Sequence, residues 1–340
     1  MDNREKNNAV TVNVDEKTPP SPKIDRVDIK TGWLCNNHCI FCVQGRKREI
    51  YGNKETNEVK RLLEEARQDA DSVVFTGGEV TIRKDLIELV RFAKDLGFKR
   101  IQIQTNGRML AYKKMCEDLI TAGANEFSPA LHGHIPELHD YLTDAKGAFR
   151  QTVRAIRNLR ELDQLIMTNT VIVRSNYRHL PELVKLLVAL KVDQLQLAMV
   201  HPLGTAAEQF FRVVPRFTLV RPYLHKALKI GIRAGVTVMT EAVPYCFMQG
   251  LEPYVAERIM PRTKIMEGHL TVNDYTVHRL TEGKLKGPQC HDCILNPMCE
   301  GPWREYPEHY GFDELIPVKD TKSMDPGFLQ KFGDILQKHE

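Results

Sequence analysis

Two hydrophobic patterns alternate along the chain from about residue 24 to residue 240. Short runs of β-branched and apolar residues, such as "RVDIKTG" at 26–32 and "DSVVFTGG" at 71–78, predict strands. Longer stretches with apolar residues at helical spacing follow them, beginning with "NEVKRLLEEARQDA" at 57–70. The alternation predicts an α/β protein.

Six strand–helix units follow one another in this way. We expect the later strands at 99–107, 125–133, 165–176 and 193–204, and the later helices at 84–97, 109–123, 147–162, 179–191 and about 218–234. Repeated units of this kind favour parallel strands joined by right-handed crossovers. Six units are too few to close an eight-fold barrel, so the pattern leaves two architectures open, a partial barrel and an open doubly wound sheet.

The segments with chemically distinctive residues all follow a predicted strand directly. A cysteine triplet follows the first strand, "GGE" the second, "TNG" the third, "HGH" the fourth, "RSN" the fifth and "HPLG" the sixth. Parallel α/β proteins bind their ligands at the carboxyl ends of the strands. We therefore expect the active site on that rim.

The two ends of the chain depart from the alternation. Residues 1–23 are polar and contain "TPPSP", which is typical of a disordered or extended arm. From about residue 241 the chain is irregular, rich in Pro, Gly, Met and Tyr, and holds a second cysteine triplet. We predict three parts: the arm at 1–23, a barrel domain with a bridging helix at 24–240, and at 241–340 a small domain with the C-terminal tail, ordered largely by its metal.

Composition and charge narrow the classes of partner. The chain has 340 residues and a formal net charge of +4, which is too small to indicate nucleic acid as the main partner. The N-terminus lacks the features of a signal peptide, and no run of about 18 apolar residues predicts a membrane span. We therefore expect a cytoplasmic protein, in which clustered thiols bind metal or do redox chemistry rather than form disulfides.

The first triplet consists of Cys35, Cys39 and Cys42. Soft thiolates favour zinc or iron–sulfur clusters. A four-iron cluster ordinarily takes four cysteines, but the nearest other thiol, Cys116, lies on a predicted helix, where we expect it to be buried. Three thiolates would leave one iron free to bind a small molecule. The alternative is a zinc site formed by Cys35, His38, Cys39 and Cys42.

Several motifs together resemble one enzyme family. Cys-x₃-Cys-x₂-Cys after the first strand, with Phe41 before the last cysteine, and "TGGEVT" at 76–81 after the second strand resemble the signatures of the radical SAM (S-adenosylmethionine) enzymes. The resemblance continues through "QTNG", "HGHIPELHDYL" and "VIVRSN" to "HPLG" and covers residues 25 to about 205. It implies a partial (β/α)6 barrel, similar to a TIM barrel, with a small C-terminal auxiliary-cluster domain.

The resemblance also implies a mechanism. The three cysteines would hold a [4Fe-4S] cluster whose open iron binds the amino and carboxylate groups of S-adenosylmethionine. One electron, supplied by a donor such as flavodoxin or ferredoxin, would split the sulfonium into methionine and a 5′-deoxyadenosyl radical that abstracts hydrogen from the substrate. The predicted S-adenosylmethionine site comprises Phe41, Thr76, Gly77, Gly78, Glu79, Asn106, Ser128 and Arg174.

Single residues of this site have expected roles. Gly77 and Gly78 would let the backbone approach the ligand, and Glu79 would accept a hydrogen bond from the methionine ammonium. The alternative is a tight turn with Glu79 in solvent. The resemblance places Phe41 beside the adenine; otherwise it is a core aromatic beneath the loop.

The chain departs from the family pattern at two positions. Relatives often have a serine and an arginine where this chain has Ala130 and Leu142. We assign the ribose contact to Ser128, which lies on the same strand face, and the carboxylate contact to Arg174. The alternative for both side chains is a place on the solvated surface.

The second triplet, in "CHDCILNPMCEGPW", consists of Cys290, Cys293 and Cys299. It resembles the SPASM or Twitch auxiliary-cluster domains of many radical SAM enzymes, although this chain has too few cysteines for the full SPASM pattern. One auxiliary [4Fe-4S] cluster is expected, closed by Cys246 or, without it, open to substrate. The alternatives are a zinc knuckle or three thiols with His291.

An auxiliary cluster implies that the substrate radical loses an electron, which favours a net oxidation or a bond-forming cyclisation. The substrate would be a small molecule or a peptide, in the biosynthesis of a cofactor, natural product, lipid, sugar or modified peptide. Two non-enzymatic alternatives are an iron–sulfur electron carrier, which needs no GGE motif, and a zinc-binding interaction module. The candidate substrate-facing residues are Gln104, His132, His134, His201, Glu241 and Tyr245.

Overall fold

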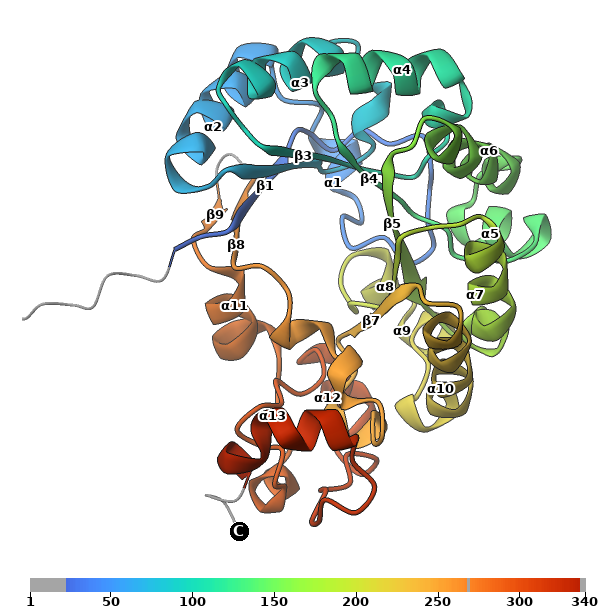
Figure 1. The fold of residues 1–340 in the computed structure, drawn as a ribbon, viewed down its shortest axis with the longest axis vertical. Coiled ribbons are helices and arrows are strands. Elements are labelled where there is room, and N and C mark those ends of the chain that lie inside the picture. The colour runs from blue at the N-terminus through green and yellow to red at the C-terminus, as the bar shows by residue number, and fades with distance from the viewer. Residues whose placement is uncertain (1–22, 268–269, 337–340) are drawn as a thin grey trace, which may run out of the picture.

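The computed structural model describes residues 23–267 and 270–336 (Figure 1). The predicted arm at 1–23 lies outside these residues except for its last member, as do residues 337–340 of the predicted tail. One sheet contains all the strands of the described residues: β1 (Arg26–Lys30), β2 (Ser72–Thr76), β3 (Arg100–Thr105), β4 (Glu126–Pro129), β5 (Leu165–Ile172), β6 (Gln194–Met199), β7 (Thr237–Glu241), β8 (Thr263–Met266) and β9 (Thr271–Val272).

The order of the strands distinguishes between the two predicted architectures. Strands β1 to β7 lie side by side in the order of the chain, and each neighbouring pair is parallel. A doubly wound sheet reverses its order at a switch point, whereas a barrel adds every strand in the same direction. The sheet is therefore an open, partial barrel, as the family resemblance implied (Figure 1).

The longer helices cover the convex outer face of the curved sheet (Figure 1). α2 shows why, because its apolar stripe buries Val59, Leu63 and Ala66. The helices are α1 (Lys47–Ile50), α2 (Thr56–Asp69), α3 (Leu86–Asp95), α4 (Lys113–Ala122), α5 (Pro136–Thr143), α6 (Ala148–Glu161), α7 (Leu180–Ala189), α8 (Thr205–Glu208), α9 (Phe210–Val213), α10 (Phe217–Arg233), α11 (Tyr275–His278), α12 (Glu305–Tyr310) and α13 (Pro326–Leu336).

The inner face of the sheet carries many polar side chains, as β1 illustrates. Val27 and Ile29 are fully buried on the helix side, whereas Asp28 and Lys30 alternate with them and point into the lumen. Closed barrels fill this space with branched apolar side chains. A polar lumen beneath the rim instead favours the binding of a polar ligand.

The C-terminal part of the chain contributes strands that the sequence did not predict. β7 spans the predicted domain boundary at 240, and β8 pairs in parallel with β1. On the outer face, Lys264 of β8 makes ion pairs with Glu65 and Asp69 of α2, at 2.9 and 2.8 Å. β8 has only four residues, "TKIM", so it lacks the length and alternation that would predict a strand.

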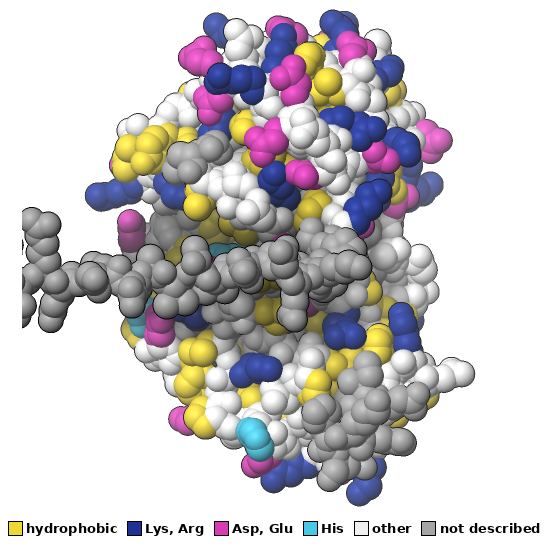
Figure 2. All heavy atoms as spheres, turned by 90° about the vertical axis from the view of Figure 1, so that its left-hand side faces the viewer, with side chains coloured by type: hydrophobic (Ala, Val, Ile, Leu, Met, Phe, Trp, Pro, Cys, Tyr) yellow, Lys and Arg dark blue, Asp and Glu magenta, His cyan; other side chains and the backbone are white. Residues whose placement is uncertain are grey.

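Basic and acidic side chains are interleaved over part of the surface (Figure 2). On the face shown in Figure 2, Lys and Arg lie next to Asp and Glu over the upper part of the molecule. Among the described residues, no helix has the length and apolar character needed to cross a bilayer.

Candidate active site

The first cysteine loop leaves the carboxyl end of β1, on the predicted rim. Cys35, Cys39 and Cys42 are all half-buried there. Burial raises the pKa of Cys35 to about 11, and burial together with the charges of Cys42 and Cys35 raises the pKa of Cys39 well above its usual range. Thiols in this setting become thiolates when a bound cation compensates their charge, so the loop has the donor chemistry of a metal cluster site.

The glycines of the GGE motif pack against this loop. Gly78 N–H donates to Gly32 O at 2.9 Å, and Glu79 N–H donates to Leu34 O at 2.8 Å. A Cβ on Gly78 would lie 2.2 Å from Leu34 O, and one on Gly77 would lie 2.4 Å from Gly32 O. These glycines therefore allow two backbone segments to approach closely, which holds the cysteine loop in place, and their approach to a ligand stays a prediction.

Glu79 is buried and connects the loops after β2 and β3 through hydrogen bonds. Its side chain is 2% exposed and accepts hydrogen bonds from Thr81 N–H at 2.9 Å, Thr81 Oγ1 at 2.5 Å, Thr105 Oγ1 at 2.6 Å and Asn106 N–H at 2.6 Å. The alternative in which Glu79 points into solvent is wrong. The carboxylate therefore fixes the geometry of the rim.

Two arginines that the sequence did not single out hold the cysteine loop. Arg48 Nη1 donates to Asn37 O at 2.7 Å, and Arg108 Nη1 donates to Asn37 Oδ1 at 3.0 Å and to the carbonyl of Asn36. Asn106 Nδ2 donates to Asn36 Oδ1 at 2.7 Å. Arg108 follows the "TNG" motif directly, and this position was the only sequence signal for its role.

The "HPLG" loop after β6 closes on the opposite end of the cysteine loop. Thr205 N–H donates to Cys42 O at 3.0 Å. Gly204 has a φ of +56°, and a Cβ there would lie 2.5 Å from Cys42 O. His201, in the same loop, stacks on Trp303 of the C-terminal segment. The structure thus brings the loops after β1, β2, β3 and β6 together.

Ser128, the predicted ribose contact, lies in the lumen, and Arg174, the predicted carboxylate contact, lies at the rim. Ser128 and Gln104 are direct partners in the β3–β4 register, so both point into the lumen, with Ser128 half-buried and Gln104 exposed. Thr76 ends β2, and its carbonyl accepts a hydrogen bond from Thr31 N–H at 2.8 Å. Arg174 is exposed after β5, and its guanidinium donates to the carbonyl of Phe211.

The histidines of the "HGH" motif support the rim from beneath. His132 is 5% exposed, packs against the edge of the Phe41 ring at 4.8 Å, and accepts a hydrogen bond at Nδ1 from Val171 N–H at 3.2 Å. Burial lowers the pKa of His132 well below its ordinary value, so the ring is neutral. The ring of His134 stacks on His179, 5.1 Å away. We therefore place His132 in the packing under the cysteine loop.

Glu241, at the end of β7, lies among charged side chains. Gln196 Nε2 donates to Glu241 Oε2 at 2.5 Å. Burial, and next the charge of Glu257, raise the pKa of Glu241. Glu257 forms an ion pair with Lys284, which also lies 3.4 Å from Glu300. This buried network connects the barrel to the C-terminal segment.

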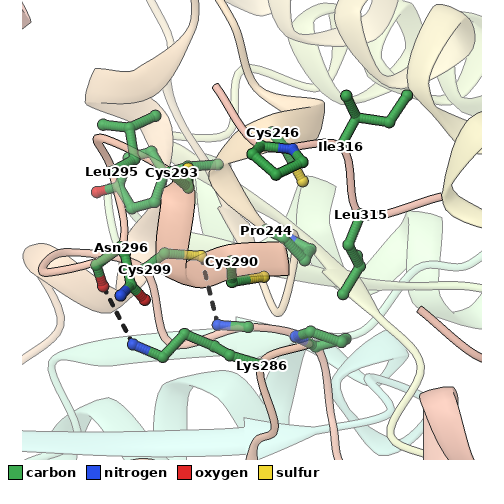
Figure 3. Close-up of a pocket in the computed structure, with 14 residues that line it drawn as sticks. Pro244, Cys246, Lys286, Cys290, Cys293, Leu295, Asn296, Cys299, Leu315 and Ile316 are labelled. Carbon is green, nitrogen blue, oxygen red and sulfur yellow. Dashed lines mark hydrogen bonds between the residues drawn. The ribbon is translucent and has the colours of Figure 1, made fainter. Parts of the chain in front are cut away.

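The second cysteine site is a pocket in the C-terminal segment (Figure 3). Cys246, in the turn after β7, lines it together with Cys290, Cys293 and Cys299. Burial raises the pKa of Cys246, and the charges of Cys299, Cys293 and Cys290 raise it further. The apolar part of the wall consists of Pro244, Leu295, Pro302, Leu315, Ile316 and Pro317.

Backbone amides point at two of these thiols. Gly301 N–H donates to Cys299 Sγ at 3.4 Å, and Val318 N–H donates to Cys293 Sγ at 3.4 Å. Hydrogen bonds of this kind stabilise thiolates and tune the potentials of iron–sulfur clusters. The pocket therefore has the donors and the environment that a cluster requires.

The structure also places three further residues of interest. Tyr245 is 2% exposed and lines the second cysteine pocket. The side chain of His291 is 91% exposed and lies beside Asp292, outside the pocket lining. Cys116 is fully buried, as predicted, and its thiol donates to Leu110 O at 3.2 Å.

The thiol sets match a cluster in donor type. Across residues 23–267 and 270–336, no three Cys, His, Asp or Glu side chains converge closely enough to hold a single metal ion. The thiolates of a four-iron cluster bind different irons and are spread around it. The first set supplies three such donors and the second supplies four.

Sequence comparison supports this assignment. The model of the Radical SAM superfamily matches residues 30–187. An AdoMet-dependent heme synthase of Oleidesulfovibrio alaskensis is 29% identical over 182 residues, 53% of this chain and 46% of that protein. A PqqA peptide cyclase of Rhodopseudomonas palustris is 32% identical over 183 residues, 53% of this chain and 48% of that protein. The chain thus spans about half the length of the curated relatives it matches.

A similar fold extends beyond the matched region. The structure of anSMEcpe with bound AdoMet and the Cp18Cys peptide has a TM-score of 0.59 and 16% identity, and the match covers 92% of this chain and 96% of that chain. At this identity the likeness is one of fold. With the cysteine loop, the GGE loop and the parallel partial barrel in place, residues 30–187 form a radical SAM domain.

Proposed function

We propose that this protein is a radical SAM enzyme, which cleaves S-adenosylmethionine reductively and uses the 5′-deoxyadenosyl radical to abstract hydrogen from a substrate. One observation carries the proposal: Cys35, Cys39 and Cys42 gather at the rim while Cys116 is buried, with its thiol bonded to Leu110 O. Three thiolates leave one iron of a four-iron cluster for the cofactor. When bound, such a cluster supplies the electron that splits the sulfonium.

Residues of β4 and of the loops after β2 and β5 would hold S-adenosylmethionine. Among the described residues, Glu79 Oε2 accepts a single hydrogen bond, from Asn106 N–H, and so keeps an acceptor position for the methionine ammonium. Ser128 points into the lumen, where its hydroxyl is available to a ribose. The exposed guanidinium of Arg174 is suited to a carboxylate. These three contacts would orient the cofactor across the rim.

The second site would hold an auxiliary [4Fe-4S] cluster with all four irons bound by protein. Its support is the convergence of Cys246, Cys290, Cys293 and Cys299 on one pocket with largely apolar walls. A fully ligated cluster transfers electrons rather than binding substrate. It would accept the electron lost by the substrate radical, so that the net reaction is an oxidation or the formation of a bond.

A peptide is the substrate class that we favour. anSMEcpe was solved with a bound peptide, and one curated relative is a PqqA peptide cyclase. The open lumen presents Gln104 beside Ser128, and an amide and a hydroxyl of this kind match the hydrogen-bonding groups of a peptide backbone.

Anaerobic reconstitution tests the proposal. The wild-type chain should bind about eight irons, four in each cluster, and should release 5′-deoxyadenosine when given S-adenosylmethionine and dithionite. Cys35→Ala should lose this cleavage, whereas Cys290→Ala should keep it and bind about four irons. Cys116→Ala is the matched control and should resemble the wild type. Cleavage by Cys35→Ala, or zinc in place of iron, would overturn the proposal.

A further inference from the structure

A basic groove lies on the outer face of the barrel, between the start of α4 and the length of α6. Four of its lining residues are cationic and one is anionic. The full lining consists of Lys113, Phe149, Arg150, Val153, Arg154, Arg157, Asn158 and Glu161.

The positive charge of this groove is not neutralised. Glu161, its one carboxylate, is bound to Lys113 at 2.9 Å. Arg150, Arg154 and Arg157 are exposed, and their guanidinium groups make no hydrogen bond or ion pair with any residue that the structure describes. They share one face of α6, where cations at this spacing repel one another. An anionic partner would relieve that repulsion.

The groove is directly connected to the first cysteine loop. Gln151, next to Arg150 on α6, accepts a hydrogen bond at Oε1 from Arg108 Nε at 2.7 Å. Arg108 Nη1 donates to Asn37 Oδ1 at 3.0 Å, and Asn37 N–H donates to Cys35 Sγ at 3.4 Å. Three residues thus join the edge of the groove to a thiol of the candidate cluster site.

We propose that this groove docks an acidic, one-electron carrier protein that reduces the first cysteine site. The inference rests on the proposed function, because reductive cleavage of S-adenosylmethionine consumes one electron that the chain does not supply. In each transfer a flavin hydroquinone of the carrier loses one electron and becomes a semiquinone. That electron would pass to the [4Fe-4S] cluster that Cys35, Cys39 and Cys42 would hold.

A protein carrier fits the groove better than a nucleic acid. Nucleic-acid-binding proteins present broad basic surfaces to a phosphate backbone. This chain has a formal net charge of only +4. The three arginines of the groove lie within about two turns of α6. A compact basic patch beside a redox site favours electrostatic docking of an acidic protein.

The test uses the full chain with both clusters reconstituted and flavodoxin hydroquinone as the probe. A triple variant carries Arg150→Glu, Arg154→Glu and Arg157→Glu. At low salt its affinity for flavodoxin and its rate of reduction by flavodoxin should both be at least about tenfold lower than those of the wild type. Reduction by dithionite and the resulting cleavage should stay at the wild-type level. Binding is measured by calorimetry, and reduction by stopped-flow absorbance.

The matched control reverses three exposed cations on α10, with Lys226→Glu, Lys229→Glu and Arg233→Glu. It should bind flavodoxin like the wild type. Added salt should weaken binding to the wild type but have little effect on the groove variant. If Glu substitutions prevent folding, the triple Gln variant makes the same comparison with a smaller charge change.

Three results would overturn the docking proposal. The first is flavodoxin binding that is unchanged in the groove variants. The second is an equal loss of flavodoxin affinity in the α10 control. The third is that the groove variants lose binding to a single-stranded RNA oligonucleotide but still bind flavodoxin like the wild type. The last result would make the groove a nucleic-acid surface. A wild-type chain that failed to cleave S-adenosylmethionine with dithionite would contradict the proposed function instead.

Discussion

The imidazole of His201 lies flat on the indole of Trp303, with ring centroids 3.8 Å apart and an angle of 5° between the planes. His201 follows β6 in the barrel, and Trp303 lies four residues after Cys299. Glu305 Oε2 is 3.6 Å from His201 Nε2, and Lys284 Nζ is 5.0 Å from the centre of a Trp303 ring. The stacked rings are therefore a direct contact between the rim and the segment that carries the second cysteine site.

We predict that the contact between His201 and Trp303 contributes measurably to the free energy of unfolding. Trp303 is 5% exposed, so Trp303→Ala should cost about 3–5 kcal/mol. A double-mutant cycle with His201→Ala should give a coupling energy of about 0.5–1.5 kcal/mol, from urea unfolding of the apoprotein. Tyr112→Ala, at an exposed ring, is the control and should add to Trp303→Ala without coupling. Additive effects of the His201 and Trp303 variants would contradict the prediction.

Gly78→Ala should separate the GGE loop from the cysteine loop. The new Cβ would lie 2.2 Å from Leu34 O and 2.6 Å from Trp33 O, both backbone atoms that have no rotamer to change. We expect a loss of about 1–3 kcal/mol in stability and a fall in iron content by about half, because only the second site would still load. Chemical unfolding and iron analysis measure the two effects.

Gly52→Ala is the matched control for this substitution. Its Cβ would meet nothing within 4 Å, so stability and iron content should both stay at the wild-type level. A Gly78→Ala protein with full iron content would show that the two loops do not depend on each other.

Glu79→Gln distinguishes a role in the rim from a role in ligand binding. The Glu79 carboxylate accepts four hydrogen bonds. In Glu79→Gln the NH₂ group of the new amide would replace one acceptor oxygen and face an N–H or O–H donor, so at least one hydrogen bond would be lost. We expect stability to fall by about 2–3 kcal/mol, measured by chemical unfolding of the apoprotein. Glu117→Gln, at an exposed position on α4, should have no effect. If Glu79→Gln keeps wild-type stability and loses only affinity for S-adenosylmethionine, ligand binding is the main role of Glu79.

His139 should make the protein less stable in acid. Burial lowers the pKa of His139 to about 4, and its Nδ1 accepts a hydrogen bond from His132 N–H at 3.1 Å. In the unfolded chain the His139 imidazole is protonated below about pH 6.5, whereas in the folded chain it stays neutral down to about pH 4. The free energy of unfolding therefore falls as the pH drops from about 6.5 to about 4.

The expected loss from this residue is about 3 kcal/mol at most between neutral pH and pH 4. His139→Gln keeps a hydrogen-bond acceptor but does not titrate, so its unfolding free energy should depend less steeply on pH. His291→Gln, at an exposed ring, should follow the wild-type curve. Identical curves for the wild type and His139→Gln would refute the assignment.

The sequence by itself determined the alternation of strands and helices, the rim that carries the motifs and the two cysteine sets. These features depend on local periodicity and on residue spacing, both of which are visible in the chain before it folds. The radical SAM domain could be predicted from Cys35, Cys39, Cys42 and the GGE motif for the same reason.

Only the tertiary structure decided between a barrel and a doubly wound sheet, because strand order is a long-range property. It showed that Gly78 packs on the cysteine loop, that Glu79 bonds to the loop after β3, and that Trp303 meets His201. Each of these contacts joins residues many positions apart, so no local pattern encodes its geometry. β8 likewise became a strand because β1 offered an edge with which it could pair.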